Sequence, residues 1–123
     1  MKRFTTAVAL LGMAAVLAFA TPAGKSETVD GYLVDVMCGS HHASEGAAYA
    51  AGHKKECLLM PACVKSGYAV LTPDKKLLKL DDKGNKQAAK LIKSTDRDTD
   101  FHVKVTGEVK EDQIAVKSIA FTK

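Results

Sequence analysis

Cysteine and histidine side chains gather in one stretch of the chain and are its clearest candidates for chemistry. All three cysteines and three of the four histidines lie between residues 38 and 63. Three thiolates and one imidazole form a tetrahedral ligand set that zinc commonly takes in proteins. The predicted metal ligands are Cys38, His41, Cys57 and Cys63, with His42 and His53 as second choices.

Copper is a second candidate for the metal. Met37 and Met60 lie directly beside the cluster in sequence, and thioether, thiolate and imidazole ligands together suit copper(I). For Met60 itself we expect packing in the core. Asp35, just before the cluster, could accept a hydrogen bond from a histidine and orient that ring from outside the ligand set. The Cys-x5-Cys spacing of the last two cysteines is looser than that of a zinc finger, so spacing does not identify the metal.

Familiar catalytic patterns are missing from the cluster. Thiol redox enzymes place a Cys-x-x-Cys pair at a helix start, and covalent haem attachment uses Cys-x-x-Cys-His. The sequence contains neither motif. A cysteine protease would need a Cys–His–Asn arrangement on a larger fold. The cluster therefore favours binding over catalysis, and we do not expect an enzyme.

The N-terminus has the organisation of a secretory signal. Lys2 and Arg3 precede an uncharged run over residues 5–20 that ends in Ala-Phe-Ala, a small-x-small cleavage site. A retained membrane anchor is the alternative, but the run is short for a bilayer span of roughly 20 residues. We expect cleavage near Ala20 and a periplasmic or secreted bacterial protein that is free of the membrane. Residues 1–20 are then the signal peptide, residues 21–27 a flexible leader and residues 28–123 a single domain.

Cleavage leaves a nearly neutral chain. The full sequence has 18 basic and 14 acidic residues. Without Lys2 and Arg3, 16 basic residues remain against the same 14 acidic ones, a net charge of +2. These charges are interspersed, whereas nucleic-acid binders usually have a clustered basic face. We therefore expect no nucleic-acid partner, while a metal ion or another exported protein stays open.

A disulfide is the competing interpretation of the same cysteines. Exported compartments oxidise thiols, and a bridge across a long loop restrains the unfolded chain. Cys57 and Cys63 could pair across a turn at Pro61, or Cys38 could pair with either of them. One cysteine is left over in every case, and the sequence does not choose the pairing.

Alternating hydrophobicity predicts five strands around the cluster. They span residues 28–36, 67–71, 76–80, 101–109 and 114–121. The apolar phase of the last strand changes near Lys117 and Ser118, which predicts a β-bulge there. Gly31 could mark another bulge in the first strand.

Short helices are predicted between the strands. Residues 45–51 could form one, and Pro61 should end any helical turn over residues 55–60. After a turn over residues 81–85, residues 86–93 carry apolar side chains on one face and predict an amphipathic helix capped by Asn85.

The predicted order is strand, long insert, strand, strand, helix, strand, strand. The fold class is therefore mainly β with short helices (α+β), in the form of a small five-stranded OB-fold-like barrel. An open α+β sheet with one packed helix is the alternative. The Cys/His-rich insert spans residues 37–66, and segments of this length are usually functional or internally structured.

These motifs resemble those of a group of small exported bacterial proteins of uncharacterised function. That group shares a D-x-x-C-G … H … C … C … S-G pattern ahead of an OB-like β region. The matching positions here are Asp35, Cys38, Gly39, Cys57, Cys63 and Gly67, followed by Val103, Val105 and Gly107. The resemblance covers nearly all of the chain after the signal and implies export and fold, but no activity.

Two functions remain open at this point. The first is an exported small protein that binds a transition metal, zinc or copper, at the Cys/His cluster. The second is a disulfide-stabilised structural or interaction module with neither metal nor catalysis.

Overall fold

The structure is a computed structural model that describes residues 25–122. The predicted signal peptide and the start of the leader lie outside these residues. Within them, no helix combines the length and the apolar character that a membrane crossing requires.

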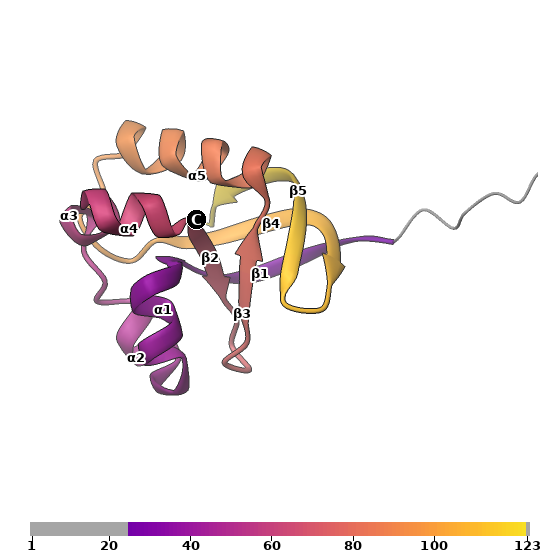
Figure 1. Cartoon of the computed structure of the whole chain (residues 1–123), viewed down its shortest axis with the longest axis horizontal. Helices are drawn as coiled ribbons and strands as arrows, with labels where there is room; N and C mark the ends of the chain where they lie inside the picture. Colours follow the sequence, from indigo (N-terminus) through magenta and orange to yellow (C-terminus); the bar gives the residue numbers. More distant parts are fainter. Residues whose placement is uncertain (1–24, 123) are drawn as a thin grey trace, which may run out of the picture.

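Five strands close into a barrel, as predicted. They are β1 (Ser26–Asp35), β2 (Tyr68–Leu71), β3 (Leu77–Leu80), β4 (His102–Lys110) and β5 (Gln113–Phe121). Around the barrel the strands follow the order β1-β2-β3-β5-β4. The pair β3 and β5 is parallel, and the other neighbours are antiparallel. The closed mixed sheet confirms the OB-like barrel and excludes the open-sheet alternative (Figure 1).

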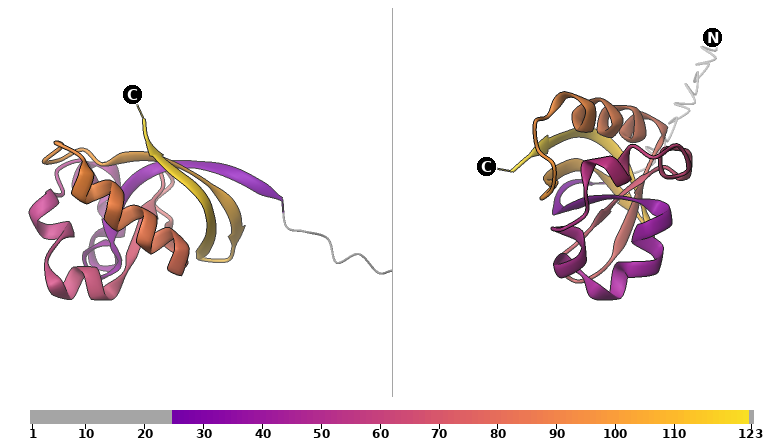
Figure 2. Two further views of the ribbon diagram at one scale, coloured as in Figure 1. Left: turned by 90° about the horizontal axis from the view of Figure 1, so that it is seen from above. Right: turned by 90° about the vertical axis from the view of Figure 1, so that its left-hand side faces the viewer.

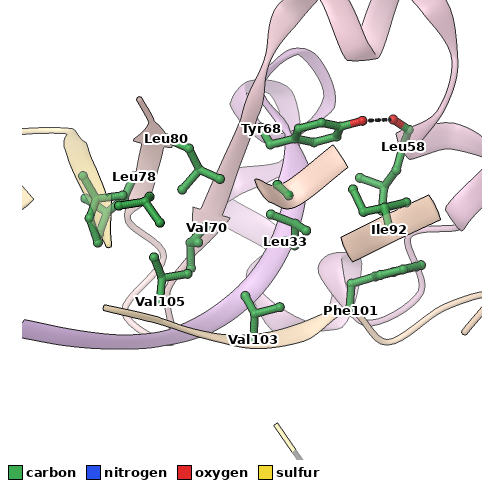
Figure 3. Packing of buried hydrophobic residues seen from close by; sticks show 13 residues of the cluster. Leu33, Leu58, Tyr68, Val70, Leu78, Leu80, Ile92, Phe101, Val103 and Val105 are labelled. Atoms are coloured by element: carbon green, nitrogen blue, oxygen red, sulfur yellow. Dashed lines mark hydrogen bonds between the residues drawn. The ribbon is translucent and has the colours of Figure 1, made fainter. Parts of the chain in front are cut away.

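Side chains from strands and helices fill the main core of the barrel. Along β4, Val103 and Val105 are buried and the intervening Lys104 is exposed, which is the alternation expected of a strand with one face on the core. Figure 3 shows these valines beside residues from β1, β2 and β3. The Tyr68 hydroxyl donates a hydrogen bond to the Leu58 carbonyl oxygen at 2.8 Å, which ties the insert to β2.

The helix between β3 and β4 begins earlier than predicted. Helix α5 (Asp82–Ser94) lies along the barrel and buries Ile92 in the core (Figure 1). Its N-cap is Asp81, whose carboxylate accepts a hydrogen bond from the Gly84 amide at 2.8 Å. The predicted turn over residues 81–85, with Asn85 as the cap, was therefore wrong. An aspartate cap satisfies a free N–H at the helix start. A segment whose amino-acid composition is typical of a turn can therefore form the first turn of a helix.

The predicted insert folds into a series of short helices, one of them within the predicted helical segment 45–51. They are α1 (Val36–His42), the 3₁₀ turn η1 (Ala43–Glu45), α2 (Ala47–Ala50), α3 (Lys55–Leu58) and α4 (Pro61–Ser66). As predicted, no helix continues through Pro61. This proline starts α4, a position where its missing N–H costs nothing. Leu58 and Ala50 are fully buried, so the insert packs on the barrel, at the end away from the start of β1 (Figure 2).

Strand β5 carries its bulge at the predicted place. Thr106 of β4 faces Ser118, and the next residue, Gly107, faces Val116. Lys117 is therefore the extra residue without a partner, and it accounts for the change of apolar phase along β5.

Gly31 does not form a bulge, so that prediction was wrong. It pairs with Val103 in an unbroken register. A Cβ atom at this position would lie 2.5 Å from the Leu71 carbonyl oxygen. Glycine is required here because two strands approach closely, which alternation in the sequence does not reveal.

Gly107→Ala is expected to destabilise the domain by about 1–3 kcal/mol, the usual cost of forcing an extra carbon into a packed site. The new Cβ would lie 2.2 Å from the Ala115 carbonyl oxygen, so the backbone must move. Gly52→Ala is the matched control, because its nearest neighbour would be the Tyr49 carbonyl oxygen at 3.7 Å. Urea unfolding measures both variants, and equal losses of stability would contradict the explanation.

Candidate metal centre

Three side chains meet where the insert packs on the barrel. Donor atoms of Asp35, Cys38 and His53 all lie within 4.8 Å of one another. They come from the end of β1, from α1 and from the connection between α2 and α3. Asp35 and His53 are buried, and Cys38 is half-buried. Within residues 25–122, no other group of three or more His, Cys, Asp or Glu side chains comes this close together, and this group could hold a metal ion.

Asp35 connects strand, helix and histidine. It is the N-cap of α1, where its Oδ2 accepts a hydrogen bond from the Cys38 amide at 2.9 Å. Its Oδ1 accepts another from His53 Nε2, also at 2.9 Å. Burial raises the pKa of this carboxyl, but the hydrogen bonds from His53 and Cys38 outweigh burial and lower the pKa to about 2. The Asp35-x-x-Cys38 sequence is thus a helix cap that places an ionised carboxylate beside a thiol.

Two thiols lie near this carboxylate and are held in the neutral form. Cys38 on α1 and Cys63 on α4 come from helices that pack on each other. Burial raises the pKa of both thiols, that of Cys63 to about 11, and the negative charge of Asp35 adds to the increase. Reactive cysteines need the opposite environment, one that favours the thiolate. Without an ion, the site therefore lacks an activated nucleophile.

All three cysteines are free thiols in the structure. Cys63 is buried, whereas Cys38 and Cys57 are half-buried. The pairs considered from the sequence are therefore not formed here.

The sequence-based ligand set is assembled in part. Cys38 belongs to the group of three, and Cys63 lies beside it. Cys57 immediately precedes the buried Leu58 and lies outside the group. Asp35 does accept a hydrogen bond from a histidine, and its carboxylate is also one of the donors in the group.

The histidine in the donor group is not the one that the sequence analysis preferred. His41 is exposed and outside the group, whereas His53, a second choice, is buried within it. His42 lies outside the group: its Nδ1 lies 2.6 Å from Glu45 Oε1, and its ring stacks on Tyr49.

Met60 was expected in the core and is instead half-exposed, with 50% of its surface accessible. It is the N-cap of α4, and the inward positions on either side of it are taken by Leu58 and Cys63. Met37, on α1, is similarly exposed at 45%.

Tyr49 is the site residue that the sequence analysis missed. Its hydroxyl oxygen lies 3.1 Å from His53 Nδ1, so both ring nitrogens of His53 have partners. Helix α2 ends at Ala50, before His53, as Gly52 suggested. The contact between Tyr49 and His53 is therefore made beyond the helix, and helical periodicity in the sequence does not predict it.

Comparison of the chain with protein-family models, with curated proteins and with solved structures finds no match. The resemblance to small exported bacterial proteins therefore stays a prediction, and the geometry of the site carries the functional argument.

Proposed function

We propose that this chain is an exported metal-binding protein whose ion is held by Asp35, Cys38, His53 and Cys63. The observation that carries the proposal is the buried group formed by the first three residues. His53 Nε2 and Asp35 Oδ1 are 2.9 Å apart. Two ligands that each lie 2.0–2.1 Å from a tetrahedral zinc ion are separated by about 3.3 Å. A small outward movement of these two side chains would therefore admit an ion.

Cys63 is the proposed fourth ligand. Its side chain is buried, with 4% of its surface accessible. Asp35 and Cys38 are the neighbouring groups that raise the pKa of its thiol, in addition to burial. A buried thiol without a disulfide, next to a carboxylate and a second thiol, is well placed to ligate a metal.

Zinc is the metal that this ligand set favours. Zinc accepts carboxylate, imidazole and thiolate ligands in one tetrahedral site. Copper(I) prefers soft sulfur and nitrogen ligands, and the carboxylate of Asp35 is a hard one. The two methionines that would favour copper are half-exposed. Four protein ligands leave no open position for substrate, which is typical of a binding or structural site rather than a catalytic one.

Elemental analysis and thiol counting test this proposal. The full chain is produced with export to a bacterial periplasm, and the purified protein is analysed for metals. Free thiols are then counted after unfolding in a chelator. We expect one zinc ion per chain and three free thiols. One free thiol without metal would overturn the proposal in favour of the disulfide-stabilised module. Stoichiometric copper would retain the site and overturn the choice of zinc.

Cobalt substitution tests the ligands directly. Cobalt(II) in a tetrahedral site absorbs visible light, and bound thiolates add charge-transfer absorption whose intensity rises with their number. We expect tetrahedral bands and an intensity that corresponds to two thiolates, those of Cys38 and Cys63. An octahedral spectrum without thiolate absorption would contradict the proposed ligand set.

A further inference from the structure

The imidazole of His53 is held from two sides. Nε2 faces the Asp35 carboxylate at 2.9 Å, and Nδ1 faces the Tyr49 hydroxyl at 3.1 Å. The ring is buried, with 6% of the surface of His53 accessible. The ring therefore cannot turn freely. Its hydrogen-bond partners, Asp35 and Tyr49, determine which nitrogen would face a bound ion.

The polarity of these hydrogen bonds follows from Asp35. An ionised carboxylate only accepts hydrogen bonds, so His53 Nε2 carries the proton and donates it to Asp35. In the neutral imidazole the other nitrogen is then an acceptor. When the ring is neutral, the Tyr49 hydroxyl therefore donates to Nδ1.

We propose that Tyr49 positions His53 so that Nε2 is the metal-ligating nitrogen. This inference rests on the proposed function. Nε2 is the nitrogen that faces Asp35, so it alone can share an ion with that carboxylate. Nδ1 is covered by the tyrosine.

With an ion on Nε2, a neutral imidazole would carry its proton on Nδ1. Nδ1 would then donate a hydrogen bond to the Tyr49 hydroxyl oxygen, which lies 3.1 Å away. Outer hydrogen bonds of this kind fix the orientation of metal-ligating histidines.

Packing fixes Tyr49 in place. Its ring stacks on His42 with centroids 4.2 Å apart and planes at 15°, and it is tilted against His53 at 5.4 Å. Its body packs against the buried cluster of Val34, Ala50, Ala69 and Leu71. Phenylalanine would preserve these ring contacts and remove only the hydroxyl, so Tyr49→Phe isolates the positioning role.

The test combines zinc affinity with nitrogen NMR on the full chain. Tyr49→Phe should weaken zinc binding by about 10–100-fold, the usual effect of losing an outer partner, as measured by competition with a chromophoric chelator. Tyr32→Phe is the matched control. Its ring stacks on His102 outside the site, and its zinc affinity should equal that of the wild type.

The nitrogen chemical shifts of His53 distinguish positioning by Tyr49 from a purely structural role, because a purely structural role would leave these shifts unchanged. In the zinc-loaded wild type we expect coordination at Nε2 and a proton at Nδ1 that exchanges slowly with solvent. In Tyr49→Phe this exchange should become faster. Coordination through Nδ1, or an affinity of Tyr49→Phe within about twofold of the Tyr32→Phe control, would overturn the inference alone. A wild-type chain that binds no zinc would overturn the proposed function and the inference with it.

Discussion

Replacing Cys38 with serine is expected to abolish stoichiometric zinc binding. Cys38 belongs to the buried donor group, and a neutral hydroxyl is a far poorer zinc ligand than a thiolate. The loss of zinc affinity should exceed the roughly 10–100-fold loss caused by removing a residue that only hydrogen-bonds to a ligand. Helix α1 should remain intact, because the Asp35 cap binds the backbone amide of residue 38 and not its side chain. Competition with a chromophoric chelator measures the affinity, and circular dichroism checks the fold.

Two further cysteine variants make this result specific. Cys57→Ser changes the cysteine outside the donor group and should bind zinc as the wild type does. Cys63→Ser removes the proposed fourth ligand and should lose binding as Cys38→Ser does. A Cys38→Ser protein that retains one tightly bound zinc ion would refute the proposed centre. Equal effects of all three substitutions would instead indicate that thiols act through folding or oxidation.

Asp35→Ala is expected to destabilise the metal-free protein by about 2–4 kcal/mol. Losing a helix cap costs about 1 kcal/mol. Leaving the buried N–H of His53 without an acceptor costs roughly another 1–3 kcal/mol. Asp35 is fully buried, so water cannot replace it without opening the structure. Urea unfolding in the presence of a chelator measures the change without any contribution from bound metal.

Asp81→Ala is the matched control for this substitution. Asp81 also caps a helix through its carboxylate, which accepts a second hydrogen bond from the backbone amide of Val116 rather than from a histidine. Its loss should cost about 0.5–2 kcal/mol, the range for a cap. If both aspartates cost the same, the pairing with His53 contributes nothing to stability.

The Asp35 carboxylate also makes the free energy of unfolding of the metal-free protein depend on pH in the acid range. Its pKa is about 2 in the folded protein and 3.8 in the ordinary unfolded state. The stabilisation is therefore complete above about pH 5 and is lost as pH falls through 3.8 to 2 and below. The total is on the order of 2 kcal/mol. The stability difference between wild type and Asp35→Asn should shrink over this range in urea unfolding, and a constant difference would contradict the assignment.

Local sequence patterns were sufficient for most of the barrel. The alternation along residues 101–109 predicted β4, and the phase change near Lys117 predicted the bulge, because both depend only on which face of one strand is buried. The start of α5 was wrong because Asp81 caps a segment whose Gly and Asn resemble a turn. Gly31 was misread because its role depends on Leu71, forty residues along the chain, and no local pattern contains that contact.

The candidate site was predictable as a segment but not as a set of ligands. The concentration of cysteine and histidine between residues 38 and 63 identified the region, and Asp35 was recognised as a histidine partner. The choice of His53 over His41 depends on how α1 and α2 pack on the barrel, which spacing does not encode. Tyr49 was missed for the same reason, since its role exists only once the histidine lies beneath its hydroxyl.

The long connection between β1 and β2 has a consequence for the order of folding. Strands β2 and β3 are joined by residues 72–76, and β4 and β5 by residues 111–112, so each pair forms by closing a short loop. Strand β1 pairs with β2 only across the whole insert and with β4 at still greater separation. Distant pairings are slower to form. We therefore expect the two hairpins first and β1 last, so Asp35 and the candidate metal centre are completed only when the barrel closes.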